Sequence, residues 1–143
     1  MLRMLLSTAL VLSLCYMGLA ETILIVNAAN PVEKISSAEV SNIYLGKVTQ
    51  WPGGLKVQAV DQKKSSPAGM AFLASIMKMS EANYKKFWVE KMLSGEAEPI
   101  TIKNTDVEIF EWVKSNTGGI GYIDAASPHA GVKVLPVDGK SNW

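Results

Sequence analysis

Short apolar runs alternate with longer amphipathic segments along this chain, and the pattern predicts alternating strands and helices. Thr22–Val26 is fully apolar and rich in β-branched residues, which indicates a buried strand. A second short strand is expected at Val57–Asp61 and a third at Ile120–Ile123, where Gly121 suggests a close backbone approach. A last short strand is predicted at 132–137.

The intervening segments carry helix signals. Ser36 with Glu39 and Thr105 with Glu108 have the spacing of capping boxes, and Pro67 and Ser80 begin two further helical patterns. Segment 96–101 is expected to be a polar loop. Apolar positions at helical spacing predict four buried stripes: Val40, Ile43 and Tyr44; Met70, Leu73, Ala74 and Met77; Tyr84, Phe87, Trp88 and Met92; Val107, Phe110 and Val113 or Lys114. The whole pattern predicts an α/β layered single domain.

The first twenty residues have the composition of a secretory signal peptide. Arg3 precedes an apolar segment at 4–17, and Gly18–Ala20 ends with small residues that a signal peptidase would read, so cleavage is expected near Ala20. Cys15 falls within this segment, so residues 21–143 contain no cysteine and no disulfide. We therefore expect a periplasmic domain, held together by its apolar core alone.

Charge restricts the partners of residues 21–143. Because Arg3 is the only arginine, this part has 13 lysines and no arginine, against 13 aspartates and glutamates. A balanced charge argues against nucleic acid and anionic lipid as partners. The absence of arginine also removes the bidentate clamp that proteins commonly use for phosphate. A bound anion would rely on backbone N–H groups, hydroxyls or lysines.

One segment, Leu55–Phe72, has the order of a small anion site: a strand, a serine-rich loop and the start of a helix. The first N–H groups of a helix lack intrahelical partners, and the helix dipole is positive at that end. Ser65 and Ser66 would add hydroxyl donors. The alternative is that Ser66 simply caps a core helix.

Catalytic and metal chemistry have little support in the sequence. A hydrolytic triad needs a nucleophile, a histidine and a carboxylate, and the only histidine, His129, lies in a Ser-Pro-His-Ala loop. One histidine without cysteine cannot build a usual zinc site. Neither GxGxxG nor GxxxxGK[ST] occurs. The methionine-rich stripe could indicate a soft metal site, but its spacing is typical of a core. We predict no catalytic residues, no metal and no cofactor.

Three motifs resemble those of phosphate-type substrate-binding proteins of ABC transporters. Ile43–Trp51 resembles the family's IFxGKxTxW segment, Val57–Phe72 its strand, anion loop and helix, and Gly119–Tyr122 its GIGY strand. The resemblance implies one lobe of a type II periplasmic-binding-protein fold. It also implies phosphate or another small oxyanion as ligand, held by loops and helix N-termini.

Matching the loop to the family's Arg, Ser-Gly-Thr pattern places Ser66, Pro67 and Ala68 on the Ser, Gly and Thr. The arginine position falls near Asp61 or Gln62, so Lys63 or Lys64 would replace its charge. The resemblance therefore implies ligand contacts from Asp61, Ser65, Ser66 and the Ala68 N–H. Asp61 would accept a proton from the oxyanion or orient the loop.

Two functional hypotheses follow. The chain would be an oxyanion-binding module that serves an ABC permease or an envelope sensor. Because one lobe alone leaves a ligand half exposed, a second copy or another partner would supply the other wall of the site. Alternatively, it would be a lobe that has lost its ligand and acts by protein docking, through apolar residues expected to be exposed such as Trp51 and Trp143.

Overall fold

The computed structural model describes residues 21–143, so the predicted signal peptide lies outside the described residues. Five strands in this part are β1 (Thr22–Asn27), β2 (Gln58–Gln62), β3 (Thr101–Lys103), β4 (Gly119–Asp124) and β5 (Val132–Val134). The helices are α1 (Ser37–Tyr44), α2 (Pro67–Phe72), α3 (Glu81–Leu93) and α4 (Asp106–Ser115), with a π-helical segment, η1 (Leu73–Met77), continuing α2.

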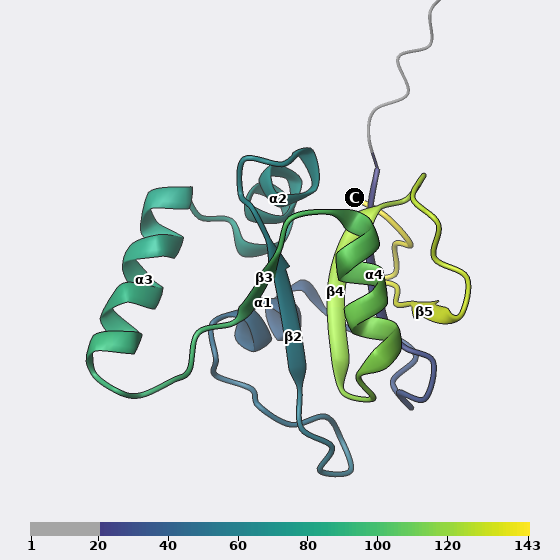
Figure 1. Ribbon diagram of the computed structural model, residues 1–143, viewed down its shortest axis with the longest axis horizontal. Coiled ribbons are helices and arrows are strands. Elements are labelled where there is room, and N and C mark those ends of the chain that lie inside the picture. Colours follow the sequence, from purple (N-terminus) through teal and green to yellow (C-terminus); the bar gives the residue numbers. More distant parts are fainter. Residues whose placement is uncertain (1–20) are drawn as a thin grey trace, which may run out of the picture.

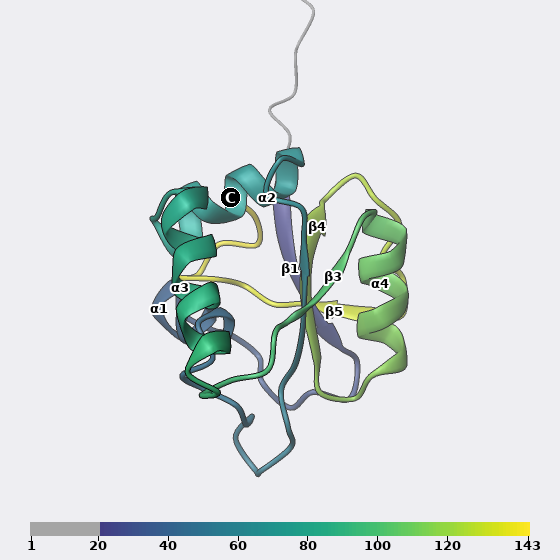
Figure 2. The same ribbon diagram turned by 60° about the vertical axis from the view of Figure 1, so that its left-hand side comes forward.

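The strands form one mixed sheet in the order β3-β2-β4-β1-β5. β2 is parallel to both of its neighbours, whereas β1 is antiparallel to β4 and β5. Helix α4 covers one face of the sheet, and α1, α2 and η1 cover the other (Figures 1 and 2). The predicted layered α/β domain is therefore confirmed. None of the helices in residues 21–143 is long and apolar enough to cross a membrane.

Alternation along β1 divides the core into two layers. Ile23 and Ile25 pack with Ile109 and Val113 of α4. Leu24 and Val26 belong to the larger cluster on the opposite face, which also contains residues of α1, α2 and η1.

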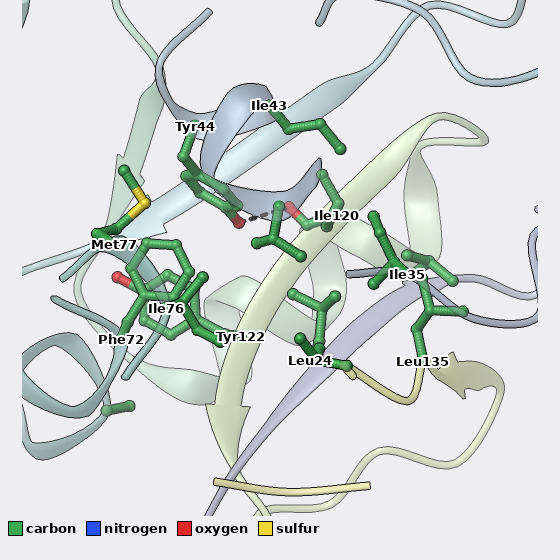
Figure 3. Packing of buried hydrophobic residues seen from close by; sticks show 14 of the residues in the cluster. Leu24, Ile35, Ile43, Tyr44, Phe72, Ile76, Met77, Ile120, Tyr122 and Leu135 are labelled. Atoms are coloured by element: carbon green, nitrogen blue, oxygen red, sulfur yellow. Dashed lines mark hydrogen bonds between the residues drawn. The ribbon is translucent and has the colours of Figure 1, made fainter. Parts of the chain in front are cut away.

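Tyr44 joins helix α1 to the sheet at the centre of the larger cluster. Its side chain is fully buried, and its hydroxyl donates to the Val60 carbonyl at 2.9 Å, with the Ile120 carbonyl at 3.3 Å. Its ring packs edge-on against Phe72 and Tyr122, which stack on each other with centroids 4.1 Å apart (Figure 3). Burial, followed by the Asp61 charge, raises the pKa of Tyr44 well above its ordinary value.

The helix signals mark the correct starts. Ser36 and Glu39 form a complete capping box, and Ser66, Ser80 and Thr105 each accept from a first-turn N–H. The box predicted at Thr105 is only half present, because the hydrogen bond runs from the Glu108 N–H to Thr105 alone.

Several expectations about exposure are wrong. Met70, Ala74, Met92 and Val107 were expected in buried stripes but are exposed. After Phe72 the wider π turn rotates the following residues, so Ile76 faces the core in place of Ala74.

Two extended segments also differ from prediction. β3 begins at the last residue of the predicted polar loop and continues to Lys103, because residues 101–103 pair with the free edge of β2. The last strand ends at Val134, three residues earlier than predicted.

Trp51 corrects another expectation, because it is buried rather than exposed. Only 4% of its surface is accessible, and its indole N–H donates to the Gly118 carbonyl at 3.0 Å. Trp143 is half-buried. Trp51 therefore stabilises the domain and is not available as a docking residue.

Gly121 sits where β4 meets α4, and we predict that Gly121→Ala is destabilising. An added Cβ would lie 2.7 Å from Ile109 Cγ2 and 2.9 Å from Val60 Cγ1. Overpacking of this kind costs about 1–3 kcal/mol. Urea unfolding measures the loss, and Gly121→Ala combined with Val60→Ala should cost less than the sum of the single changes. Unchanged stability of Gly121→Ala would contradict the packing described.

Candidate functional site

The candidate site lies at the carboxyl end of β2, where the strand delivers two polar side chains into the interior. Asp61 and Gln62 are each 3% exposed. The loop 63–66 then turns into α2, with Pro67 at the first helical position. The predicted order of strand, loop and helix start is therefore present in the structure.

Asp61 is the centre of a buried polar cluster. Its Oδ1 accepts from the Tyr122 hydroxyl at 2.5 Å, from the Gln62 N–H at 2.9 Å and from the Lys64 ammonium. Its Oδ2 accepts from the Tyr84 hydroxyl at 2.7 Å. Four donors from three elements and the loop satisfy this carboxylate, which is what burial of a charge requires.

The Lys64 side chain turns inward, with only 8% of its surface exposed. Its ammonium pairs with Asp61 and donates to the Tyr122 hydroxyl oxygen at 2.8 Å. It also lies 5.0 Å from the ring centroid of Phe72 and 4.7 Å from that of Tyr84. Burial lowers the pKa of Lys64, and the adjacent Asp61 opposes this shift.

The two tyrosines that hold Asp61 resist ionisation. Burial is the main cause that raises the pKa of Tyr84 and of Tyr122 well above the ordinary value, and the negative charge of Asp61 adds to it. Both phenols therefore remain protonated donors to the carboxylate across the physiological range.

Ser66 acts as a helix cap. Its hydroxyl accepts from the Gly69 N–H at 3.0 Å, and its single proton faces Gln62 Oε1 at 2.8 Å and the Lys63 carbonyl at 2.7 Å. Gln62 in turn donates to the Tyr122 carbonyl at 2.7 Å. These bonds support the capping alternative for Ser66 and tie the loop to the sheet.

The other two predicted ligand residues differ in access. Ser65 is exposed, and no protein partner of its hydroxyl is recorded among residues 21–143. Ala68 is 6% exposed and is the second residue of α2. The structure thus brings Asp61, Ser65, Ser66 and Ala68 to one loop, but only Ser65 among them presents its side chain to solvent without an internal role.

A cavity of about 450 Å³ opens beside this loop. Asp61, Lys63, Lys64 and Ser65 line one end. The remaining walls are largely apolar and come from α3 and the approach to β3, including Tyr84, Trp88, Val89, Met92, Ile100 and Ile102. An anion in this cavity would therefore meet polar groups from the loop and from Glu81 and Lys85 of α3.

The sequence predicts the loop but not the buried contacts that hold it against the sheet and α3. Lys64 was considered only as a substitute cation, and Tyr84 only as a core residue. The missed signal is that a predicted buried helical stripe and a predicted strand each contain a tyrosine, whose hydroxyl needs a polar partner when buried. The carboxylate that ends β2 is that partner for Tyr84 and Tyr122.

Catalytic groups do not gather at this site. His129 lies in the connection between β4 and β5, where its Nδ1 is 2.7 Å from the Ser127 carbonyl oxygen. Within residues 21–143 no three His, Cys, Asp or Glu side chains are grouped to hold a metal ion. The arrangement is suited to binding through charge and hydrogen bonds.

Comparison with solved structures defines the fold class. The chain superposes on an ABC-type phosphate transport receptor from Vibrio cholerae with a TM-score of 0.65 at 20% identity, covering 83% of this chain and 46% of the receptor. PstS from Borrelia burgdorferi gives 0.67 at 15% identity, with 85% and 48% covered. A protein from Clostridium perfringens solved with bound phosphate gives 0.68 at 22% identity, with 85% and 46% covered.

These likenesses confirm the fold implied by the sequence resemblance, that of phosphate-type substrate-binding proteins. The chain spans less than half the length of each of these proteins, which agrees with one lobe of such a fold. No family model and no curated protein matches the sequence.

The raised tyrosine pKa values predict the alkaline behaviour of the domain. Tyr44, Tyr84 and Tyr122 are the tyrosines of residues 21–143, and all three have raised pKa values. In the unfolded chain they ionise near the ordinary value of 10.0. The fold holds them protonated, so their contribution to stability is present below about pH 10 and is lost as pH rises further.

Lys64 has the opposite sign. Its lowered pKa means that the unfolded chain binds more protons between that value and 10.5, so its contribution to stability increases with pH over this window.

We expect tyrosinate absorbance to appear only with loss of the circular dichroism of the fold, whereas the urea-unfolded control titrates near pH 10. Ionisation of Tyr84 or Tyr122 near pH 10 in a folded domain would contradict the buried cluster.

Proposed function

We propose that this chain is an extracytoplasmic oxyanion-binding module built on one lobe of the phosphate-binding-protein fold. The observation that carries the proposal is the loop end of the cavity. There the buried Lys64 ammonium, the exposed Lys63 and the Ser65 hydroxyl line the cavity together, just before the start of a helix. Phosphate is the ligand favoured, because one structural neighbour is a phosphate transport receptor and another was solved with bound phosphate.

The ligand would be held from the loop side. Ser65 would donate a hydroxyl hydrogen bond, and Lys63 would supply an exposed charge. Lys64 would act through its field, because Asp61 and the aromatic rings keep its ammonium inside. Asp61 would orient the loop rather than accept a proton from the ligand, since four donors already surround it.

This arrangement supports weak binding. The loop has no arginine fork, and Pro67 offers no N–H at the helix start. Hydrogen bonds made in water contribute little net free energy. We expect a dissociation constant on the order of 1 mM, which corresponds to about −4 kcal/mol.

The biological setting is part of the same proposal. The predicted signal peptide at 1–20 would deliver the chain to the periplasm, and the names of the neighbours point to an ABC permease as a partner. An envelope sensor, as the alternative partner, would contact the same loop. A binding role rather than catalysis is proposed for both settings.

A calorimetric titration with phosphate and with sulfate tests direct binding. We predict that Ser65→Ala weakens phosphate binding by about threefold to tenfold, because it removes one hydrogen bond. Ser115→Ala, at the exposed end of α4, is the matched control and should bind as the wild type does. Absence of heat for both anions at about ten times the expected dissociation constant would refute the proposal.

Asp61→Asn provides a second test with a distinctive sign. The isosteric amide removes the negative charge beside Lys64, and with it the interaction that opposes the lowering of the Lys64 pKa. The titration is therefore made at a mildly acidic pH, where the ammonium stays protonated and would act on an outside anion without an internal competitor. We expect phosphate affinity to rise by about tenfold, provided that the circular dichroism spectrum shows a folded domain. Unchanged affinity in the folded variant would show that Lys64 has no part in anion binding.

A second function is favoured by one observation: the Asp61 carboxylate already occupies Lys64 inside the loop. The lobe would then dock on a membrane permease or sensor without a ligand. Crosslinking in the envelope distinguishes the two. Equal capture of such a protein by the wild type and Ser65→Ala, with no calorimetric heat for any anion, would favour docking.

A further inference from the structure

Helix α3 has an outer face that nothing in the described chain covers. Tyr84 is its only buried residue, and the helix stands apart from the rest of the domain in Figure 1. Val89, Met92 and Leu93 are 40%, 44% and 83% exposed. They recur at i, i+3 and i+4, so they form one apolar strip along the C-terminal half of the helix.

This strip continues into the groove beside the sheet edge. Val89 and Met92 line the cavity of about 450 Å³ together with Ile102 of the edge strand β3, which is 62% exposed. Grouped exposure of large apolar side chains beside a sheet edge is unusual for a surface that faces only water. We call this surface, made by Val89, Met92, Leu93 and Ile102, the α3 face.

The two ends of the α3 face carry opposite charge. At the end next to the Asp61–Ser65 loop, three lysines outnumber one glutamate: Lys63, Lys85 and Lys86 against Glu81. At the end where the chain leaves α3, Glu90 and Lys91 lie on the last turns of the helix and Glu96 donates its N–H to the Lys91 carbonyl. Glu98 follows and lines the adjoining cavity together with Glu96, so glutamates outnumber the one lysine at this end. The face is therefore apolar at its centre, basic at one end and acidic at the other.

We propose that the α3 face binds a second copy of this chain, with the two α3 helices antiparallel across a two-fold axis. A two-fold axis through the centre of the strip would bring the basic end of each copy against the acidic end of the other. The apolar strips would then meet in the middle, as an isologous interface requires. The charge pattern is thus complementary to itself.

The length of the chain supports the same occupant. Each phosphate-type protein compared above is a little more than twice as long as the part that this chain matches. Two copies therefore have about the mass of one such protein. Because Val89, Met92 and Ile102 of the α3 face line the same cavity as the loop, the second copy would also cover part of the opening that a single copy leaves to solvent.

Measurement of the molar mass by sedimentation and light scattering tests the proposal on the full chain after export and purification. The wild type should change from monomer to dimer between about 1 µM and about 1 mM. Leu93→Asp should weaken the dimer by about tenfold or more, because it places a charge on the most exposed side chain of the apolar strip.

Val107→Asp is the matched control, because Val107 is also apolar and 62% exposed but belongs to α4 on the other face of the sheet. It should dimerise as the wild type does. A monomer at all concentrations, or a dimer that Leu93→Asp leaves intact, would overturn the proposal.

Paired charge reversals test the orientation without altering the apolar strip. Lys63→Glu with Lys85→Glu makes both ends acidic, and Glu96→Lys with Glu98→Lys makes both ends basic. Each double variant alone should be monomeric at concentrations where the wild type is dimeric, and an equimolar mixture should form heterodimers. When circular dichroism shows that both double variants are folded, failure of their mixture to associate would overturn the antiparallel arrangement.

The interface does not depend on the proposed oxyanion function. Dimerisation measured in the absence of phosphate would stand if no anion bound. Anion binding by a monomeric Leu93→Asp variant would leave the oxyanion proposal intact while the interface is tested separately.

Discussion

The buried pair between Asp61 and Lys64 is the interaction on which the architecture of the site depends. A carboxylate and an ammonium removed from water are tolerated only when their remaining hydrogen-bonding capacity is satisfied. Here two tyrosine hydroxyls and a backbone N–H complete the shell of Asp61, and three aromatic rings surround Lys64. The loss of either charge would leave the other buried without a partner.

This pair also explains why separate elements meet at one point. Asp61 comes from β2, Lys64 from the loop, Tyr122 from β4 and Tyr84 from α3. The hydroxyl of Tyr84 and its place in the core are what fix the first turns of an otherwise exposed helix. The position of α3, and hence the cavity beside the loop, therefore follows from satisfying one carboxylate.

Much of the fold could be predicted from the sequence, because it depends on local signals. Capping residues at Ser36, Ser66 and Ser80 and the glycine in β4 specify helix starts and a close approach without reference to distant residues. β3 could not be predicted in this way. It has three residues, follows Pro99 in a polar segment and forms because β2 offers an unpaired edge.

The candidate site shows the same division between local and distant information. The strand, loop and helix start were visible, and so was the choice between a cap and an anion role for Ser66. The burial of Asp61 depends on Tyr84 and Tyr122, which are 23 and 61 residues away along the chain. No periodicity or spacing within the loop contains that information.

The fold thus places a lysine beside the cavity and then supplies it with an internal carboxylate. The charges of Lys64 and Asp61 nearly cancel. Any affinity for an outside anion therefore comes from exposed donors and from the part of the Lys64 field that Asp61 does not cancel. The residual field of the pair is felt most strongly where water is excluded, because a low dielectric screens it less. The selectivity of this loop therefore depends on what covers the cavity, and the apolar α3 face lies directly along its wall. The affinity proposed for a ligand and the burial of the α3 face are therefore linked, because covering the α3 face would limit the access of solvent to the Asp61–Ser65 loop.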